Sequence, residues 1–586
     1  MRDQGRTAIA GGRRRRVSAV AVMLGVATVV AACSSSGSGS GGASSTPASS
    51  PAPAVTTSAP APGTSVSSAT GGNSPTAGTS PAGGTSPTSE ATPSQPGGTT
   101  TSAATGAGSS SAPPSHRGGS LRAAILAAPQ ETLDATKAAD ELDQARNELV
   151  YDKVAARAAD GSVVPVLYTN ATHNADGSQW VFTMNPKAVF ADGTPVRGED
   201  ILATLAADAG QDSVQDLNMI DLKKSTASGG TVTFVLTEPL ADLPLQFALS
   251  FMVVLPGGKG STDADSMNGS GPYRVTSFTP GQRTVLQRRE DYWGGDAHGM
   301  ADTITLIGVS DPAAGMRALL AHQVDLAAGV TLADAKANES NSAVVLHEST
   351  APEGLDFILN ATIAPFDDVR VRQAFRLAID RPQLAATALS GIGTVGNDVW
   401  GAGYPGYDAD LPQRTQDIAQ AKSLLAQAGH PQVSLTVYAP QGGGPLTQGT
   451  LLIAQQVKAA GFDVTVKQLS TPEYYSPQGW TTWPAVAFGL GASFATMAGF
   501  FYLPGSYYNF GWNKPEWTAD FGKALATFDP AEQQTLLNGL QQQLWDSGPD
   551  VIWGLAPTVI ATSPQVTGMD GVADFDYPDL SDVTVP

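Results

Sequence analysis

The segment that decides the fold class runs from residue 433 to residue 469 and has the sequence VSLTVYAPQGGGPLTQGTLLIAQQVKAAGFDVTVKQL. A strand is predicted over Val433–Tyr438 and a second strand over Val464–Leu469. Between them, a helix is predicted over Leu451–Ala460, ending at Gly461. Strand, helix and strand at this spacing form a βαβ unit, so we expect an α/β fold.

Strands and helices are also predicted before this segment. The strands are Leu121–Leu126, Trp180–Met184 and Thr231–Leu236. The first helix begins at Glu199 and Asp200, after the turn Asp192–Pro195. Two further helices are predicted over Val369–Leu389 and over Ile418–Ala428, and the second of them ends at Gly429. No repeat of fixed period accompanies them, so we expect a mixed fold without internal repetition.

Length, charge and cysteine content exclude several classes of protein. The chain has 586 residues, which is too long for one ordinary domain, so two or more lobes are expected. With 33 Lys+Arg and 53 Asp+Glu, the formal net charge is -20, which argues against a nucleic-acid partner. A single cysteine excludes an intramolecular disulfide and a cysteine-based zinc site.

Residues 1–33 have the pattern of an export signal. Arg13–Arg16 form a positive start, and Val17–Ala32 is an uncharged apolar run too short for an ordinary membrane span. The run ends at Cys33, and small residues before a cysteine resemble the bacterial lipobox, which implies a diacylglycerol anchor on Cys33. A plain signal peptide with an incidental cysteine is the alternative, and the arginine run leaves Sec and twin-arginine export both open.

Residues 34–116 consist almost entirely of Ser, Gly, Thr, Ala and Pro, and Glu90 is their only charged residue. Such a segment has little apolar surface to bury, so we expect a disordered tether. As a flexible coil its reach is on the order of 50 Å. The sequence therefore predicts a folded body, residues 117–586, held off the outer face of a cell membrane.

Catalytic and metal motifs are not recognisable in the body. Gly491–Ala495 lacks the last glycine of G-x-S-x-G, the six histidines contain no H-E-x-x-H, and Gly442–Gly444 is not followed by G-K-[ST]. Asp408 and Asp410 lack the rest of a calcium loop. We therefore expect no enzyme activity, no cofactor and no metal site.

Six groups of motifs occur in order from residue 118 to about residue 465. They are Glu131–Asp134 with Leu149–Asp152; Trp180–Met184 with Val189–Val196 and Glu199–Asp200; Gly269–Arg274 with Arg289–Gly295; Val324–Ala327; Asn360 with Pro365–Ala374 and Ala378–Arg381; and Pro405–Asp408. In this order they resemble the family 5 solute-binding proteins of ABC importers, which include dipeptide, oligopeptide and nickel binders.

The resemblance implies a two-lobed, periplasmic-binding-protein-like fold of type II, with an extra subdomain in lobe I. It places lobe I at residues 117–350 plus 551–586, lobe II at 351–550, and hinges near 348–352 and 547–555. A small polar ligand would bind in the cleft between the lobes, and the closed form would dock on the permease subunits. We expect a monomer, since nothing in the sequence indicates an oligomer.

The same resemblance identifies candidate ligand-binding residues. Peptide-binding members carry a motif of the type G-W-x-A-D-Y, whose aspartate pairs with the ligand's ammonium group; the matching residues here are Gly489, Leu490, Gly491, Ala492, Ser493 and Phe494. Serine thus stands at the aspartate position, and a buried ammonium group without its carboxylate costs about 3–5 kcal/mol. A peptide with a free amino terminus is disfavoured, unless Asp140 or Glu141 supplies the charge from lobe I. A solvated acidic helix is the alternative for those two residues.

Aromatic residues are the remaining candidates for the cleft wall. Trp400 lies on a Gly/Pro-rich loop. The stretch Tyr474–Trp517 is aromatic-rich, and the candidates in it are Tyr474, Tyr475, Trp480, Trp483, Phe494, Phe500, Phe501, Tyr502, Tyr507, Tyr508, Phe510 and Trp512. An aromatic cleft suits sugars, blocked peptides and amphipathic compounds. The alternative is that half of them form the core of lobe II.

Three functions follow from these observations. The chain is expected to be a lipid-anchored solute receptor of an ABC importer. The serine at the aspartate position and the long tether leave open a receptor-shaped lipoprotein that regulates cell-envelope assembly without transport. An envelope enzyme with an unrecognised site is the third alternative.

Overall fold

The computed structural model describes residues 117–127, 131–138, 140–158, 161–208, 217–442, 444–474, 476–480, 482–504, 506, 508, 510–512, 514–569 and 579–586. Cys33, the predicted signal and the predicted tether lie outside these residues. Within the described ranges, no helix is both long and apolar enough to cross a membrane.

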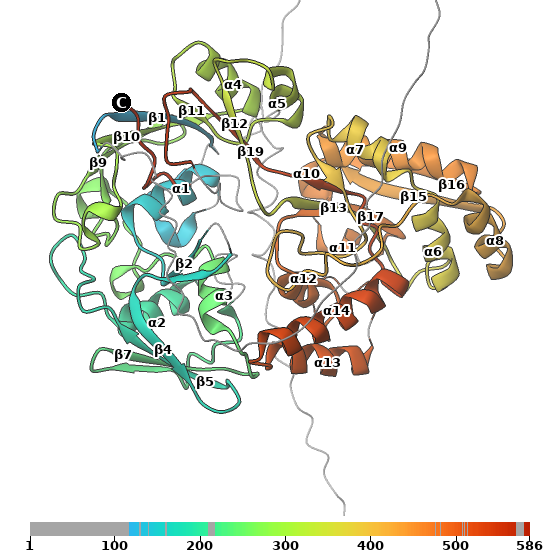
Figure 1. Ribbon diagram of the computed structural model, residues 1–586, viewed down its shortest axis with the longest axis horizontal. Coiled ribbons are helices and arrows are strands. Elements are labelled where there is room, and N and C mark those ends of the chain that lie inside the picture. Colours follow the sequence, from blue (N-terminus) through green and yellow to red (C-terminus); the bar gives the residue numbers. More distant parts are fainter. Residues whose placement is uncertain are drawn as a thin grey trace, which may run out of the picture. The chain divides into compact units, whose positions relative to one another are not determined.

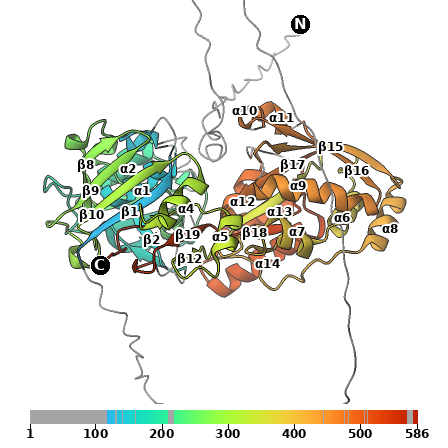
Figure 2. The same cartoon turned by 90° about the horizontal axis from the view of Figure 1, so that it is seen from above.

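The first lobe is built on a seven-stranded sheet (Figure 1). In spatial order its strands are β12 (Val345–Glu348), β19 (Val559–Thr562), β11 (Leu326–Ala327), β1 (Ser120–Leu126), β10 (Thr303–Val309), β9 (Arg283–Arg288) and β8 (Tyr273–Thr279). Strand β1 runs parallel to β10 and β11, and the other pairs are antiparallel. Helix α1 (Glu141–Val150) packs on one face, and α4 (Pro312–Leu320) and α5 (Leu332–Asn338) pack on β19 (Figure 2).

A subdomain with its own core adds to the first lobe. It contains a four-stranded antiparallel sheet in the order β4 (Tyr168–His173), β5 (Gln179–Met184), β7 (Thr231–Val235) and β6 (Thr226–Ser228), the hairpin β2 (Ala155–Arg157) and β3 (Val163–Pro165), and helices α2 (Gly198–Ala207) and α3 (Leu243–Leu249). Alternating side chains of β5 and β7 enter this core, including Trp180, Phe182 and Phe234. The extra subdomain implied by the sequence is therefore present.

The second lobe is built on a six-stranded sheet. Its strands, in spatial order, are β14 (Thr394–Val395), β18 (Gly554–Ala556), β13 (Glu353–Leu359), β17 (Ala485–Leu490), β15 (Val433–Pro440) and β16 (Phe462–Leu469). Its helices are α6 (Val369–Leu377), α7 (Arg381–Ala388), α8 (Ile418–Ala428), α9 (Pro445–Gln456), α10 (Thr471–Tyr474), α11 (Pro477–Trp480), α12 (Phe494–Phe501), α13 (Pro515–Leu525) and α14 (Pro530–Ser547). Short 3-10 turns complete the described fold: η2 (Ala135–Lys137), η4 (Pro256–Gly258), η5 (Ala264–Ser266), η6 (Gly295–Ala297) and η7 (Val457–Ala459).

The predicted βαβ unit is confirmed, because β15 and β16 are parallel over eight residue pairs and α9 connects them. The helix begins earlier than predicted, at Pro445, whose fixed φ suits a first helical position. The single helix predicted over Val369–Leu389 is wrong. The chain forms α6 and α7 there, because the Asp380 carboxylate accepts a hydrogen bond from the Gln383 N–H and starts a new helix.

The chain crosses between the two sheets twice. It leaves β12 for β13 through residues 349–352 and returns from β18 to β19 through residues 557–558. The first crossing lies within the segment 348–352 and the second lies after the segment 547–555, and the hinge roles expected for these two segments stay predictions. The second crossing lies this late in the chain because β18 pairs with β13 and β14 of the second sheet.

Several family motifs contact one another in the first lobe. The Asp152 carboxylate accepts hydrogen bonds from the Tyr292 hydroxyl at 3.0 Å and the Trp293 indole N–H at 2.8 Å. Arg289 donates to the carbonyl oxygens of Gly269 and Gly271, each at 3.0 Å. These motifs therefore stabilise one junction between α1, β8 and β9.

Two arginines of α6, Arg372 and Arg376, have a structural role in the second lobe. Arg372 donates to the carbonyl oxygens of Phe366, Ser547 and Gly548. Arg376 donates to that of Asp550 at 2.9 Å. They bind the end of α14 and the chain that follows it to α6.

Candidate functional site

The strand order of the second sheet reverses at β15. This strand leads through α9 to β16 on one side, whereas β17 joins β15 on its other side, and both pairs are parallel. In open α/β sheets, ligands bind outside the carboxyl ends of the strands at such a reversal. We call this edge, formed by Pro440, Leu490, residues 491–493 and the start of β13 at Glu353, the carboxyl edge.

The first sheet has the same kind of reversal at β1, which lies between β10 and β11 and runs parallel to both. Strand β1 ends at Leu126, and residues 128–130 after it lie outside the described residues. Each lobe thus has one sheet edge suited to a ligand.

Three predicted ligand-binding residues lie together at the carboxyl edge. Gly489 is in β17, Gly491 follows it, and Ser493 is the N-cap of α12. The Ser493 hydroxyl accepts a hydrogen bond from the Thr496 N–H at 3.1 Å, and its residue is 6% exposed. Ser493 therefore starts a helix and brings no charge to this edge.

Trp400 lies inside the second lobe. It is 2% exposed, its indole N–H donates to Asp550 Oδ1 at 3.2 Å, and its ring packs against Phe488 and Phe501. The ring is thus part of the core next to the carboxyl edge. Its role as a wall residue stays a prediction.

Asp140 and Glu141 lie at the start of α1 in the first lobe. The Asp140 carboxylate is the N-cap and accepts a hydrogen bond from the Asp143 N–H at 2.7 Å. Asp140 is 4% exposed and Glu141 is half-buried, so neither is the solvated acidic surface considered above. A ligand contact by either residue stays a prediction.

The aromatic segment contributes mainly to the core. Eight of the twelve candidates named above are at most 4% exposed: Tyr474, Trp480, Phe494, Phe501, Tyr502, Tyr508, Phe510 and Trp512. Trp483 and Phe500 are partly buried, and Tyr475 and Tyr507 lie outside the described residues. These eight rings pack on one another around α12, which agrees with the alternative that half of the candidates form the core. A cleft wall formed by Trp483 or Phe500 stays a prediction.

A buried pair of carboxyl groups lies beneath the carboxyl edge, and sequence reasoning missed it. Asp356 Oδ1 accepts hydrogen bonds from the N–H groups of Val551 and Phe357, at 2.7 and 2.5 Å. Asp550 accepts from the Tyr502 hydroxyl at 2.5 Å as well as from Trp400. Asp356 interrupts the apolar run of residues 354–359, which was the available signal.

The pKa shifts of the two carboxyl groups favour one proton shared between them. Burial, and then the neighbouring Asp550 carboxylate, raise the pKa of Asp356 well above its ordinary value, and burial also raises the pKa of Asp550. Within the described part of the chain, Asp356 Oδ2 is buried without a donor. A protonated Asp356 that donates to Asp550 satisfies both groups.

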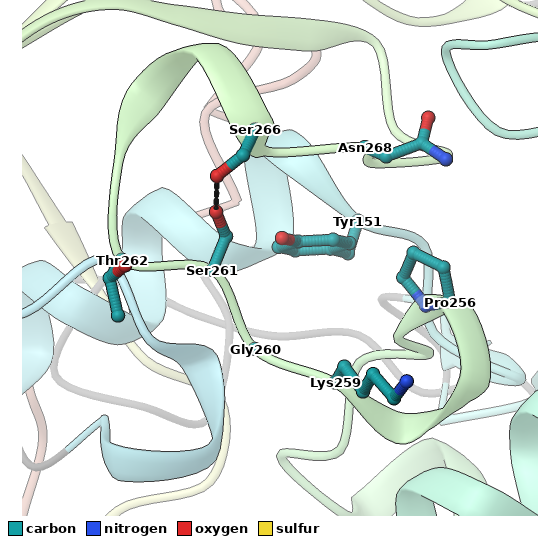
Figure 3. Close-up of a pocket in the computed structure, with 8 residues that line it drawn as sticks. All are labelled: Tyr151, Pro256, Lys259, Gly260, Ser261, Thr262, Ser266 and Asn268. Atoms are coloured by element: carbon teal, nitrogen blue, oxygen red, sulfur yellow. Dashed lines mark hydrogen bonds between the residues drawn. The ribbon is translucent and has the colours of Figure 1, made fainter.

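A cavity of about 290 Å³ lies elsewhere, in the first lobe (Figure 3). It is lined by Tyr151, Pro256, Lys259, Gly260, Ser261, Thr262, Ser266 and Asn268. Tyr151 is 1% exposed and Ser261 contacts Ser266 across the cavity wall. No group of three or more His, Cys, Asp or Glu side chains that could hold a metal ion occurs among the described residues.

Solved structures with this arrangement are two-lobed binding proteins. The structure of AgaA from A. tumefaciens R10 in complex with agropinic acid has a TM-score of 0.64 and 20% identity, covering 80% of this chain and 99% of that one. DppA from Helicobacter pylori in complex with the peptide STSA has a TM-score of 0.65 and 17% identity, covering 80% and 99%. The fold is therefore that of a two-lobed periplasmic binding protein.

The sequence comparison is more specific than the fold. The family model for bacterial extracellular solute-binding proteins, family 5, matches residues 162–512. The glutathione-binding protein GsiB of Pectobacterium atrosepticum is 24% identical over 482 residues, which cover 77% of this chain and 92% of GsiB. The chain belongs to the family 5 bacterial extracellular solute-binding proteins, as the ordered motifs predicted.

Proposed function

We propose that this chain is the lipid-anchored, extracytoplasmic receptor of an ABC importer, and that it binds a peptide-like or other small polar organic ligand between its lobes. The observation that carries the proposal is the family match over residues 162–512, within a fold of two lobes joined by two crossings. The permease subunits are its expected protein partners.

The ligand class is supported by similar proteins and by the carboxyl edge. The names of three of the similar proteins specify glutathione, agropinic acid and a peptide, which are all small polar organic compounds. Ser493 is a helix cap without charge, and the Asp140 carboxylate is occupied by the backbone of α1. We therefore expect weak binding of a free peptide amino group at Ser493.

Two measurements on the purified chain test this function. Native mass spectrometry should detect a co-purified organic solute of low mass. Thermal unfolding with unmodified di- and tripeptides should show no rise in melting temperature, because a buried ammonium group without its carboxylate costs about 3–5 kcal/mol. A clear rise with such peptides contradicts the argument from Ser493. A chain that retains and binds no solute contradicts the receptor function.

The lipid anchor has a separate test. Cys33→Ser should abolish incorporation of labelled fatty acid and should move the protein from the membrane fraction to the soluble fraction. Because Cys33 is the only cysteine in the sequence, no second thiol confuses the labelling. A membrane-bound, labelled Cys33→Ser chain excludes this anchor.

A further inference from the structure

The cavity in Figure 3 lies within the first lobe, between the end of α1 and the segment Pro256–Asn268. This segment passes around the ring of Tyr151, the C-cap residue of α1. It joins two cores, because Val254 just before it packs in the subdomain, whereas Met267 packs in the core of the seven-stranded sheet. None of the residues that line the cavity belongs to the carboxyl edge or to the second lobe.

The Tyr151 hydroxyl is a buried donor that lacks an acceptor among the described residues. Tyr151 is 1% exposed and lines the cavity, and no hydrogen bond joins its hydroxyl to any described residue. Burial raises the pKa of Tyr151 to about 12, although the nearby Arg146 lowers it, so the hydroxyl keeps its proton at neutral pH. A buried donor without an acceptor costs free energy, and a ligand oxygen in the cavity would remove that cost.

The charge of the cavity lining is positive. Lys259 is the only charged residue of the lining, and its ammonium group forms no ion pair within the described part of the chain. The backbone N–H groups of residues 260–262, which follow it, donate to no described residue. A carboxylate beside this segment, that of Asp134, is paired with Lys137 at 2.7 Å and leaves Lys259 uncompensated. The lining thus offers one cation and several hydrogen-bond donors.

The side-chain acceptors of the lining are already used. The hydroxyls of Ser261 and Ser266 form a hydrogen bond with each other, and Ser266 Oγ also donates to Asp263 Oδ2 at 2.8 Å. Asn268 Oδ1 accepts a hydrogen bond from the Asp192 N–H at 3.0 Å. A site with unused donors and occupied acceptors suits a ligand group that only accepts hydrogen bonds, and a negative charge strengthens those bonds.

We propose that this cavity is a second ligand site, separate from the carboxyl edge, and that it binds a small organic anion through a carboxylate or phosphate group. One oxygen of that group accepts the hydrogen bond of the Tyr151 hydroxyl, and the Lys259 ammonium group supplies the opposite charge. The exposed Lys259 side chain is long and rotatable, so it can reach an anion bound at the hydroxyl. The volume of about 290 Å³ is at the lower end for small-molecule sites, so the ligand is small.

Two pairs of probes, each an anion and its neutral counterpart, test the site on the full chain. They are succinate with its diamide, and glycerol 3-phosphate with glycerol. Ligand-detected NMR titrations should show that at least one anion binds about tenfold or more tightly than its neutral counterpart. The anion with the larger preference identifies the recognised group as a carboxylate or as a phosphate.

Two substitutions locate the binding in this cavity. Tyr151→Phe removes only the hydroxyl, so it should weaken binding of the preferred anion about tenfold and leave the melting temperature of the free chain unchanged. Lys259→Gln should weaken binding to a similar extent. Lys187→Gln, at another exposed lysine of the first lobe that does not line the cavity, is the matched control and should bind the anion like the wild type.

Four results would overturn the proposal. They are equal binding of both members of each pair, no binding of either anion at about 10 mM, wild-type affinity in Tyr151→Phe or in Lys259→Gln, and a lower melting temperature of the free Tyr151→Phe chain. The last result would mean that the hydroxyl already has a partner in the protein. None of them affects the proposed receptor function, which the co-purified solute tests separately.

Discussion

At the scale of single residues, burial decides what each polar side chain can do. Asp398 is fully buried, and burial alone would raise its pKa, yet Arg381, Arg414 and Arg376 hold that pKa below its ordinary value. Arg381 and Arg414 each donate to its carboxylate at 2.6 Å. Burial raises the pKa of Asp356, and the neighbouring Asp550 carboxylate raises it further, so this pKa moves in the opposite direction.

The acid pair predicts a pH dependence of stability. The pKa of Asp356 is raised in the folded state, so its contribution is fully present below the unfolded pKa and is lost as the pH rises through the folded pKa. Asp356→Asn keeps an acceptor for Val551 and a donor for Asp550 without a titrating proton. We expect the variant to gain stability relative to the wild type as the pH rises, because it lacks a slope of up to about 1.4 kcal/mol per pH unit.

Urea unfolding between pH 5 and pH 8.5 measures this difference, with each pH set in buffers of about equal ionic strength. Asp520→Asn, at an exposed position of α13, is the control and should leave the slope of the wild type unchanged. Equal slopes for the wild type and Asp356→Asn would show that the two carboxyl groups do not share a proton.

At the scale of elements, close backbone contact fixes how α1 meets the sheet of the first lobe. Gly271 donates its N–H to the Val150 carbonyl at 2.8 Å, at the end of α1. A Cβ atom at Gly269 would lie 1.9 Å from that same carbonyl oxygen. The glycines of this motif are therefore needed because a Cβ atom would clash with the end of α1, in addition to forming the turn that the sequence predicted.

Gly269→Ala should lower the free energy of unfolding by about 3 kcal/mol or more, because neither the Val150 carbonyl nor the loop can move freely. Chemical denaturation measures the loss. Gly522→Ala in α13 is the matched control, since a Cβ there has nothing within 4 Å, and it should stabilise the helix by up to about 1 kcal/mol. A Gly269→Ala chain as stable as the wild type would contradict the contact.

At the scale of the whole molecule, the subdomain of the first lobe contacts the second lobe at a distance from the crossings. The ring of His173 in β4 stacks on Phe528 with centroids 4.0 Å apart, and the Ala241 N–H donates to the Leu525 carbonyl at 2.7 Å. Arg157 lies over the ring of Tyr404 at 5.0 Å. These contacts hold the two lobes against each other at positions away from the carboxyl edge.

Phe528→Ala should favour a more open arrangement of the lobes, because the lost stack is worth about 0.5–1.5 kcal/mol. Small-angle scattering should show a larger radius of gyration than for the wild type. Leu451→Ala removes an apolar side chain of α9 that is 41% exposed, and it should leave the radius unchanged. An unchanged radius for Phe528→Ala would mean that this contact does not hold the lobes together.

The amino-acid sequence by itself determined the α/β class, the βαβ unit at 433–469 and the family, because strand and helix periodicity and short motifs are properties of neighbouring residues. It also located Gly489, Gly491 and Ser493, which lie in one such motif. Only the tertiary structure decided that Asp356 meets Asp550 and that Glu353 lies over Gly489. Strand pairing brings these residues together from distant parts of the chain, and no local pattern records which strands will be neighbours.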